Sequence, residues 1–137
     1  MFDYYGFQNS LIAFVLAFVA AGLFAIAFKI IYQFATPYHE RTLIRDGNVA
    51  AAMTLGAALL GYILVLASAL THTVSLIEFA VWALVAGIIQ IVAFTIVRRI
   101  VMPDFSDRIV RGELAAAIYM GSISIGVGLL NAACLSA

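Results

Sequence analysis

Few side chains in this 137-residue sequence could take part in chemistry: seven basic residues, seven acidic residues, two histidines and one cysteine. His39 and His72 are separated by a long uncharged stretch, and Cys134 has no second cysteine to pair with. Zinc and iron–sulfur sites need several Cys or His ligands together, and a hydrolase triad needs a nucleophile beside a histidine and an acid. We therefore expect no metal, no cofactor and no enzymatic activity.

Asn48 and Glu113 are the main candidates for a polar site. Each follows a glycine and precedes one further residue and three alanines. In an oligomer, copies of Glu113 would form a ring that selects cations. The structural alternative is a carboxylate at a helix start that pairs with a nearby arginine. The sequence leaves both interpretations open.

Glu78 is a third candidate, because ionisable residues within a membrane are often functional. Ser75 precedes it by three residues, which fits a capping box at a helix start and explains Glu78 without transport. Four arginines near the first two candidates could contact anionic lipid headgroups or protein partners: Arg41, Arg45, Arg108 and Arg111.

The composition defines the elements that must position these residues. Hydrophobic residues make up 66% of the chain, charged residues make up 10%, and the mean hydropathy is +1.14. Soluble domains carry about 25% charged residues. The composition therefore excludes a soluble enzyme and a nucleic-acid-binding protein, and it predicts an integral protein of the lipid bilayer.

Four long uncharged runs predict four transmembrane helices: residues 4–28, 47–71, 79–97 and 114–137. A bilayer core needs about 20 apolar residues in a helix. We expect an all-α membrane protein with short loops and a single domain over residues 1–137. All seven basic residues lie in residues 29–45 and 98–111. The positive-inside rule places both segments in the cytoplasm and both termini outside, in the periplasm.

An internal match within the chain indicates a repeat. Residues 44–61 and 109–126 are identical at seven of 18 positions. We interpret this match as a duplicated two-helix hairpin, residues 8–71 and 73–136. Because each unit contains two helices, the repeat is parallel.

The repeat includes glycines that would allow close helix packing: Gly56, Gly61, Gly121 and Gly126. We expect the second and fourth helices to form the tight interior contacts, with Gln90 and Asn131 bonding across helices. The phenylalanines of the first helix are expected to face lipid: Phe14, Phe18, Phe24 and Phe28. Tyr32 and Tyr38 are expected in an interfacial aromatic belt.

One motif resembles a known family: Glu40-Arg41-x-Leu43-Ile44-x-x-Gly47-Asn48-x-Ala50-Ala51-Ala52. It is similar to the YjfL-like family of bacterial inner-membrane proteins, the "domain of unknown function 350" group. The second unit matches with Gly112-Glu113-Leu114-Ala115-Ala116, where glutamate replaces asparagine. The resemblance implies a multi-pass protein of the bacterial inner membrane without an established activity. Family members are encoded near membrane-stress proteins and ATP-grasp enzymes, an association that points to envelope maintenance.

Two functional hypotheses follow. The first is a small homo-oligomeric channel or permeation assembly, with Asn48 and Glu113 at its polar site. The alternative is a membrane scaffold that recruits cytoplasmic stress-response partners through the charged segments. A proton-coupled drug exporter ranks last, because such exporters bury a carboxylate deep in a helix and Glu78 and Glu113 both lie near helix starts.

Overall fold

The computed structural model describes residues 4–36 and 38–135, and these residues are almost entirely helical. Four helices are long and apolar enough to cross a membrane: α1 (Tyr4–Ala35), α3 (Val49–His72), α4 (Leu76–Ile96) and α6 (Leu114–Leu135). The prediction of four apolar helices is confirmed, although α1 continues beyond the predicted end at residue 28 and residues 136–137 of the last predicted span lie outside the described residues. The shorter elements are α2 (Glu40–Arg45), the π-helical turn η1 (Val97–Val101) that continues α4, and α5 (Phe105–Val110).

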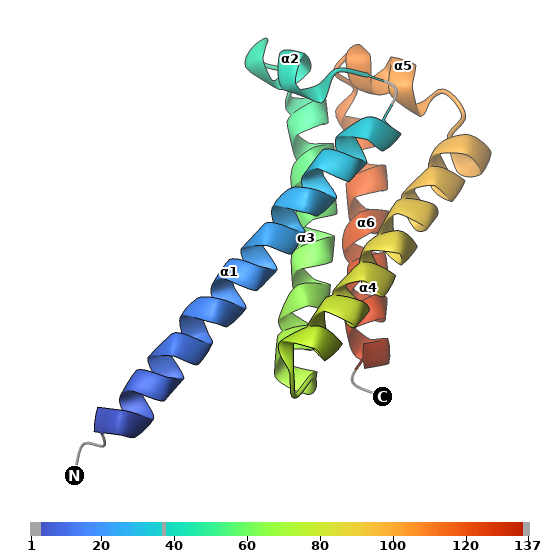
Figure 1. Cartoon of the computed structure of the whole chain (residues 1–137). Coiled ribbons are helices and arrows are strands. Elements are labelled where there is room, and N and C mark those ends of the chain that lie inside the picture. Colours follow the sequence, from blue (N-terminus) through green and yellow to red (C-terminus); the bar gives the residue numbers. More distant parts are fainter. Residues whose placement is uncertain (1–3, 37, 136–137) are drawn as a thin grey trace.

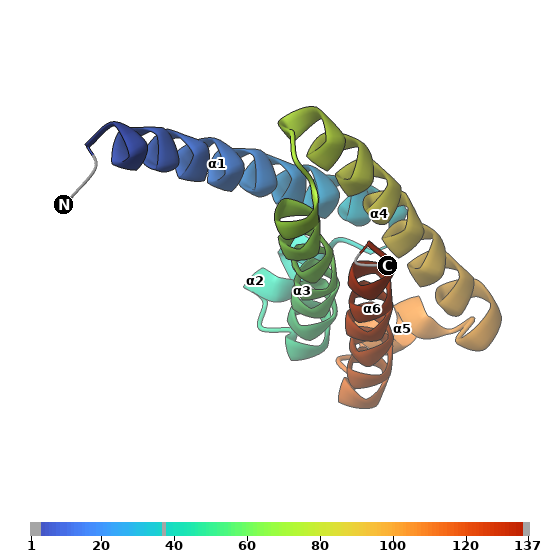
Figure 2. The same cartoon turned by 90° about the horizontal axis from the view of Figure 1, so that it is seen from below.

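Helices α3 and α6 stand side by side and run in the same direction (Figure 1). Helices α1 and α4 run the opposite way and slant across them. Both α2 and α5 lie over the ends where α3 and α6 begin. We call this end the cap, which comprises residues 38–48 and 97–113. The view from below shows α1 extending away from the other three long helices toward its N-terminal end (Figure 2).

Close backbone contact joins α3 to α6, as expected for membrane helices that pack through small residues. A Cβ atom on Gly128 would collide with the backbone of Gly61, and one on Gly121 would lie 2.9 Å from the Cβ of Ala57. Gly56 and Gly126 differ from expectation, because a Cβ on either would meet nothing within 4 Å. They lie off the contact face, so only Gly61 and Gly121 of the four expected glycines support this packing.

Aromatic rings attach the second half of α1 to the bundle. The Phe28 ring stacks on Tyr62 of α3 with centroids 4.4 Å apart, and Phe24 meets Phe79 of α4 at 5.7 Å. Phe28 is 4% exposed, so the expectation that it faces lipid is wrong. The first half of the helix does leave large apolar side chains uncovered, with Phe14 and Phe18 66% and 70% exposed.

Elements of the two halves of the chain have matching boundaries. Helix α5 begins and ends the same number of residues after α2 begins and ends. Helix α6 begins that same number of residues after α3 begins. Gly47 and Gly112 are separated by this same number of residues. Among the described residues, these two glycines are the ones with a positive φ angle, 86° and 80°.

Candidate functional site

Two glycine turns connect the short cap helices to the long helices. After α2, the Gly47 N–H donates to the Ile44 carbonyl and the Asn48 N–H donates to Leu43. After α5, the N–H groups of Gly112 and Glu113 donate to the carbonyls of Ile109 and Arg108. Both are Schellman-type helix ends, which place a glycine in the left-handed region. Each turn therefore fixes the direction in which the next long helix leaves the cap.

Both polar atoms of the Asn48 side chain form hydrogen bonds with the backbone. Its Oδ1 accepts from the Ala51 N–H at 3.0 Å, which caps α3. Its Nδ2 donates to the carbonyls of Ile109 and Val110 at 2.8 and 3.3 Å. A single side chain thus caps one long helix and ties it to the last turn of α5.

Glu113 occupies the equivalent place after α5 but makes different bonds. Its Oε2 accepts from Arg111 Nη2 at 3.0 Å and from Arg108 Nε at 3.2 Å. The hydrogen bond from Arg111, joined by the one from Arg108, holds the pKa of Glu113 below its ordinary value. Glu113 therefore carries its charge at neutral pH, in a solvent-accessible ion pair. This arrangement matches the structural alternative for a carboxylate at a helix start.

An open cavity of about 460 Å³ lies where the two glycine turns approach each other. Asn48, Gly47, Gly112 and Arg111 are among its lining residues, whereas Glu113 is not. The structure therefore brings Asn48 and Arg111 to one hollow in the cap and leaves the Glu113 carboxylate outside it.

Glu78 lies at the end of the molecule opposite the cap. The Ser75 Oγ accepts from the Glu78 N–H at 3.2 Å, and Glu78 Oε2 lies 3.5 Å from the Val74 N–H. The predicted cap by Ser75 is present, but the Glu78 carboxylate faces the N–H of the residue before Ser75 rather than that of Ser75, so only half of the capping box forms. Glu78 is thus far from Asn48 and Glu113, and the three predicted polar residues do not form one site.

The four predicted arginines divide into two pairs. Arg108 and Arg111 are held by Glu113. Arg41 and Arg45 are exposed on α2, and within residues 4–36 and 38–135 no ion pair involves them. Only the α2 pair is therefore fully available to a ligand or partner.

A buried carboxyl group that sequence reasoning missed lies inside the cap. Glu40 is 2% exposed, and neither of its oxygens has a hydrogen-bond partner among the described residues. The hydroxyls of Tyr32 and Tyr38 and the Nε of Arg98 are buried and unpartnered in the same way. Buried polar atoms are nearly always bonded, so this group, which we call the Glu40 cluster, needs an explanation.

Aromatic packing holds the Glu40 cluster between the halves of the chain. The Tyr32 ring lies 4.8 Å from Phe94 of α4, and the Tyr38 ring lies 6.1 Å from Phe105 of α5. Burial raises the pKa of Glu40 to about 7. The nearby Thr36 hydroxyl and the positive charge of Lys29 partly offset this increase. Burial likewise raises the pKa of Tyr38, which keeps that phenol neutral. Glu40 is thus a carboxyl that can change protonation state near neutral pH.

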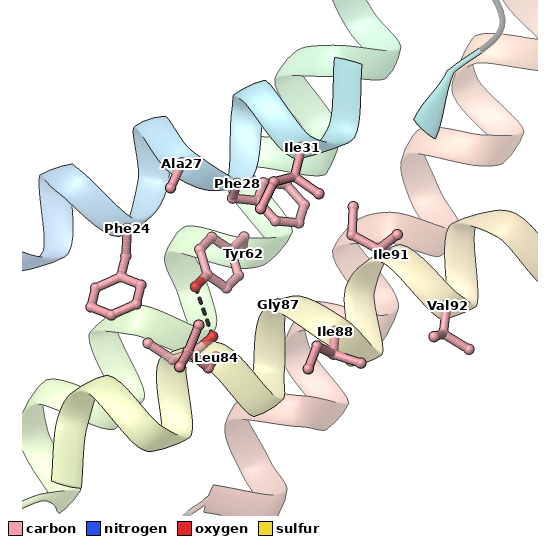
Figure 3. Close-up of a pocket in the computed structure, with 11 residues that line it drawn as sticks. Phe24, Ala27, Phe28, Ile31, Tyr62, Leu84, Gly87, Ile88, Ile91 and Val92 are labelled. Atoms are coloured by element: carbon pink, nitrogen blue, oxygen red, sulfur yellow. Dashed lines mark hydrogen bonds between the residues drawn. The ribbon is translucent and has the colours of Figure 1, made fainter. Parts of the chain in front are cut away.

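At membrane depth, polar side chains bond between helices, although the buried Oε1 of Gln90 has no hydrogen-bond partner among the described residues. Gln90 Nε2 donates to the Ser124 carbonyl and Asn131 Nδ2 donates to the Ala86 carbonyl, both at 3.3 Å, so the expected bonds between helices are confirmed. The Tyr62 hydroxyl donates to the Ala83 carbonyl at 2.7 Å beside an apolar pocket of about 270 Å³ (Figure 3). In Figure 3, side chains of α1 and α4 such as Phe28 and Ile91 close around this pocket. It offers an apolar surface rather than a polar route.

Comparison with known proteins agrees with this architecture. The model of the family described as "Domain of Unknown Function (DUF350)" matches residues 6–135. The chain belongs to the DUF350 family. It is 36% identical over 128 residues to the "UPF0719 inner membrane protein YjfL" of Escherichia coli (strain K12). The aligned residues cover 93% of this chain and 96% of the relative. The protein of the same name from Escherichia coli O157:H7 matches equally. No solved structure matches.

These matches and the four apolar helices identify this DUF350 member as a multi-pass inner-membrane protein of unknown function. The first part of the family-like motif, from Glu40 to Asn48, lies in the cap, and its three alanines lie in the first turns of α3. Glu40 is buried, Gly47 provides the left-handed turn, and Asn48 bridges the two halves. The part of the motif with the most specific geometry therefore builds the cap rather than the interior of the membrane.

Proposed function

We propose that the protein is a docking subunit that holds a cytoplasmic protein at the inner membrane through its cap. The supporting observation is the pair of exposed arginines, Arg41 and Arg45, on a cap helix that the Gly47 turn joins directly to α3. On the other half of the cap, Phe105 and Ile109 of α5 are fully buried, and Asn48 bonds to the end of that helix. Because the arginines already lie on a folded helix, binding a partner would require little ordering of the chain.

The distribution of charge supports a cytoplasmic position for the cap. Six of the seven basic residues lie in it: Arg41, Arg45, Arg98, Arg99, Arg108 and Arg111. Positive residues favour the cytoplasmic side of the bacterial inner membrane. In this orientation both ends of the chain face the periplasm.

We further infer that the two halves, residues 8–71 and 73–136, are copies of one hairpin. The matching boundaries of α2 and α5 and the paired left-handed glycines support this inference. Two parallel units would explain why α3 and α6 run side by side in the same direction.

The docking proposal can be tested by affinity purification from membranes with the double variant Arg41→Glu, Arg45→Glu. Loss of the bound cytoplasmic protein is expected, because both guanidinium groups are exposed. Glu78→Lys is the matched control, since it reverses a charge at the opposite end of the molecule. Partners retained by the double variant, or lost equally in the control, would contradict docking through the cap.

A homo-oligomeric permeation assembly is the second candidate, and the exposed first half of α1 favours it. Phe14 and Phe18 leave most of their apolar surface open to a second copy. The side-chain amides of Gln90 and Asn131 donate to backbone carbonyls of neighbouring helices, and the pocket beside Tyr62 is apolar, so a polar pathway would require several copies. Ion flux through purified protein in liposomes, compared with Glu113→Gln, tests this idea. A flux that changes in the variant would support permeation. Crosslinking in lipid that yields only monomer would contradict it.

A further inference from the structure

The Glu40 cluster brings together the buried side-chain oxygens of Tyr32, Tyr38 and Glu40 and the Nε atom of the half-buried Arg98, and none of these atoms has a well-formed hydrogen bond among the described residues. Tyr32 belongs to α1, Tyr38 to the segment before α2, Glu40 to α2, and Arg98 to η1. We propose that Glu40 is a proton-binding site, which takes up and releases a proton on the cap side and thereby controls how firmly α1 is joined to the cap. This site does not depend on the docking function.

The surroundings of Glu40 favour the neutral carboxyl group. Glu40 is 2% exposed and neither carboxyl oxygen has a well-formed hydrogen bond, so ionisation would bury a charge with little stabilisation beyond the nearby Thr36 hydroxyl and the charge of Lys29. Lys29 on α1 is the cation whose charge acts on Glu40, whereas the charge of Arg98 acts on Tyr38. On the α5 side, the apolar ring of Phe105 packs on Tyr38.

A proton fits this site better than a divalent metal ion. Among the described residues, no group of three or more His, Cys, Asp or Glu side chains is placed to hold a metal. Glu40 is the one carboxylate of the cluster, and its neighbours Tyr32 and Tyr38 are neutral phenols that can donate or accept a hydrogen bond. A protonated Glu40 carries no net charge and therefore needs no counter-ion.

A surface cavity on the cap side adjoins Glu40. This cavity of about 260 Å³ is lined by Glu40 together with Gln33, Tyr38 and His39. His39 is exposed. Proton exchange with the solvent on the cap side therefore requires a small movement of the Tyr38 region rather than passage through the bundle.

The position of Glu40 explains what ionisation would change. Tyr32 lies in the last turns of α1, and Tyr38 and Glu40 follow shortly after that helix ends. A charged Glu40 must draw in water or move outward, and either change disturbs the packing of Tyr32 on Phe94 and of Tyr38 on Phe105. Proton release is therefore coupled to loosening of the joint between α1 and the cap.

Infrared difference spectroscopy on the full chain in lipid nanodiscs tests the site directly. We expect the C=O band of a protonated carboxylic acid to disappear with a midpoint of about 7 as the pH rises. The band should be absent in Glu40→Gln and unchanged in Glu113→Gln, the control for a solvent-accessible carboxylate. Lys29→Gln should raise the midpoint, because it removes the positive charge that favours ionisation, and this variant retains Glu40 if Glu40→Gln does not fold.

Three results would overturn the proposal. The first is a band that is identical in the wild type and in Glu40→Gln. The second is a midpoint at the ordinary glutamate value, which Lys29→Gln does not move. The third is a midpoint that falls when sodium replaces a bulky organic cation at constant ionic strength, which would make this a cation site instead.

Discussion

Asn48 at the start of α3 donates a hydrogen bond of 2.8 Å to the carbonyl oxygen of Ile109 near the end of α5. The bond joins residues 61 positions apart and links the halves of the chain at the cap. Because the same side chain also caps α3, the direction of that helix and the position of α5 are fixed together.

Asn48→Ala should lower stability by about 1–3 kcal/mol, because it removes a helix cap and leaves the Ile109 carbonyl without this donor. Asn48→Asp retains the cap acceptor but cannot donate to Ile109, so its loss should be partial. Thermal unfolding in detergent measures both effects. Equal losses in the two variants would show that the bond to α5 accounts for the whole effect, and no loss in either would contradict the structural role.

Gly61→Ala and Gly128→Ala should each weaken the packing of α3 on α6. A Cβ on Gly128 would collide with the backbone of Gly61, and a Cβ on Gly61 would meet the Ser124 carbonyl. Backbone atoms cannot move aside cheaply, so we expect losses of about 1–3 kcal/mol, typical of overpacking. Gly56→Ala is the matched control, since its Cβ meets nothing within 4 Å. A control that is destabilised as strongly as Gly61→Ala would contradict this contact.

Glu40 should make stability depend on pH. Its pKa is raised from 4.5 to about 7 in the folded protein, so between these values the folded state binds the proton that the unfolded state has lost. The contribution of Glu40 to stability therefore falls by about 3 kcal/mol as the pH rises through this window. Thermal unfolding of the wild type and Glu40→Gln should diverge as the pH increases, with the variant the more stable at alkaline pH. Parallel pH profiles would contradict the prediction.

Cys134 provides a native label for the orientation of the chain. It is exposed near the end of α6, at the end of the molecule away from the cap. If the cap is cytoplasmic, a thiol reagent that cannot cross the inner membrane should label Cys134 in intact cells with a permeable outer membrane. Cys134→Ser should abolish the signal. Labelling that requires lysis of the inner membrane would reverse the proposed orientation.

The spans could be predicted from sequence because charge exclusion from lipid acts on each helix separately. The long uncharged runs correspond to α1, α3, α4 and α6. The capping role of Ser75 beside Glu78 could be predicted for a similar reason, since it involves residues close in sequence.

The Glu40 cluster could not be predicted in this way, because it depends on how the end of α1 packs against α4 and the cap. Tyr32 and Tyr38 are compatible with an interfacial belt until α1 is placed against α4 and α5. The glycine contacts show the same limit. Gly56 and Gly61 have similar local sequences, but only Gly61 faces α6. Gly128, which meets it, has no glycine at the matching place in the first half.

Helix α1 is 32 residues long, whereas α3 has 24 and α6 has 22. At about 1.5 Å per residue it measures about 48 Å, well beyond a hydrocarbon thickness of about 30 Å. A helix of this length fits by tilting, and α1 does slant away from α3 toward its N-terminal end. In a bilayer, the exposed side chains of the first half of α1, such as Phe14 and Phe18, would meet lipid around a single copy, whereas the second half is packed on α3 and α4. We expect a thinner or thicker bilayer to change the tilt of α1, and a change of tilt would strain the joint between the end of α1 and the cap beside Glu40.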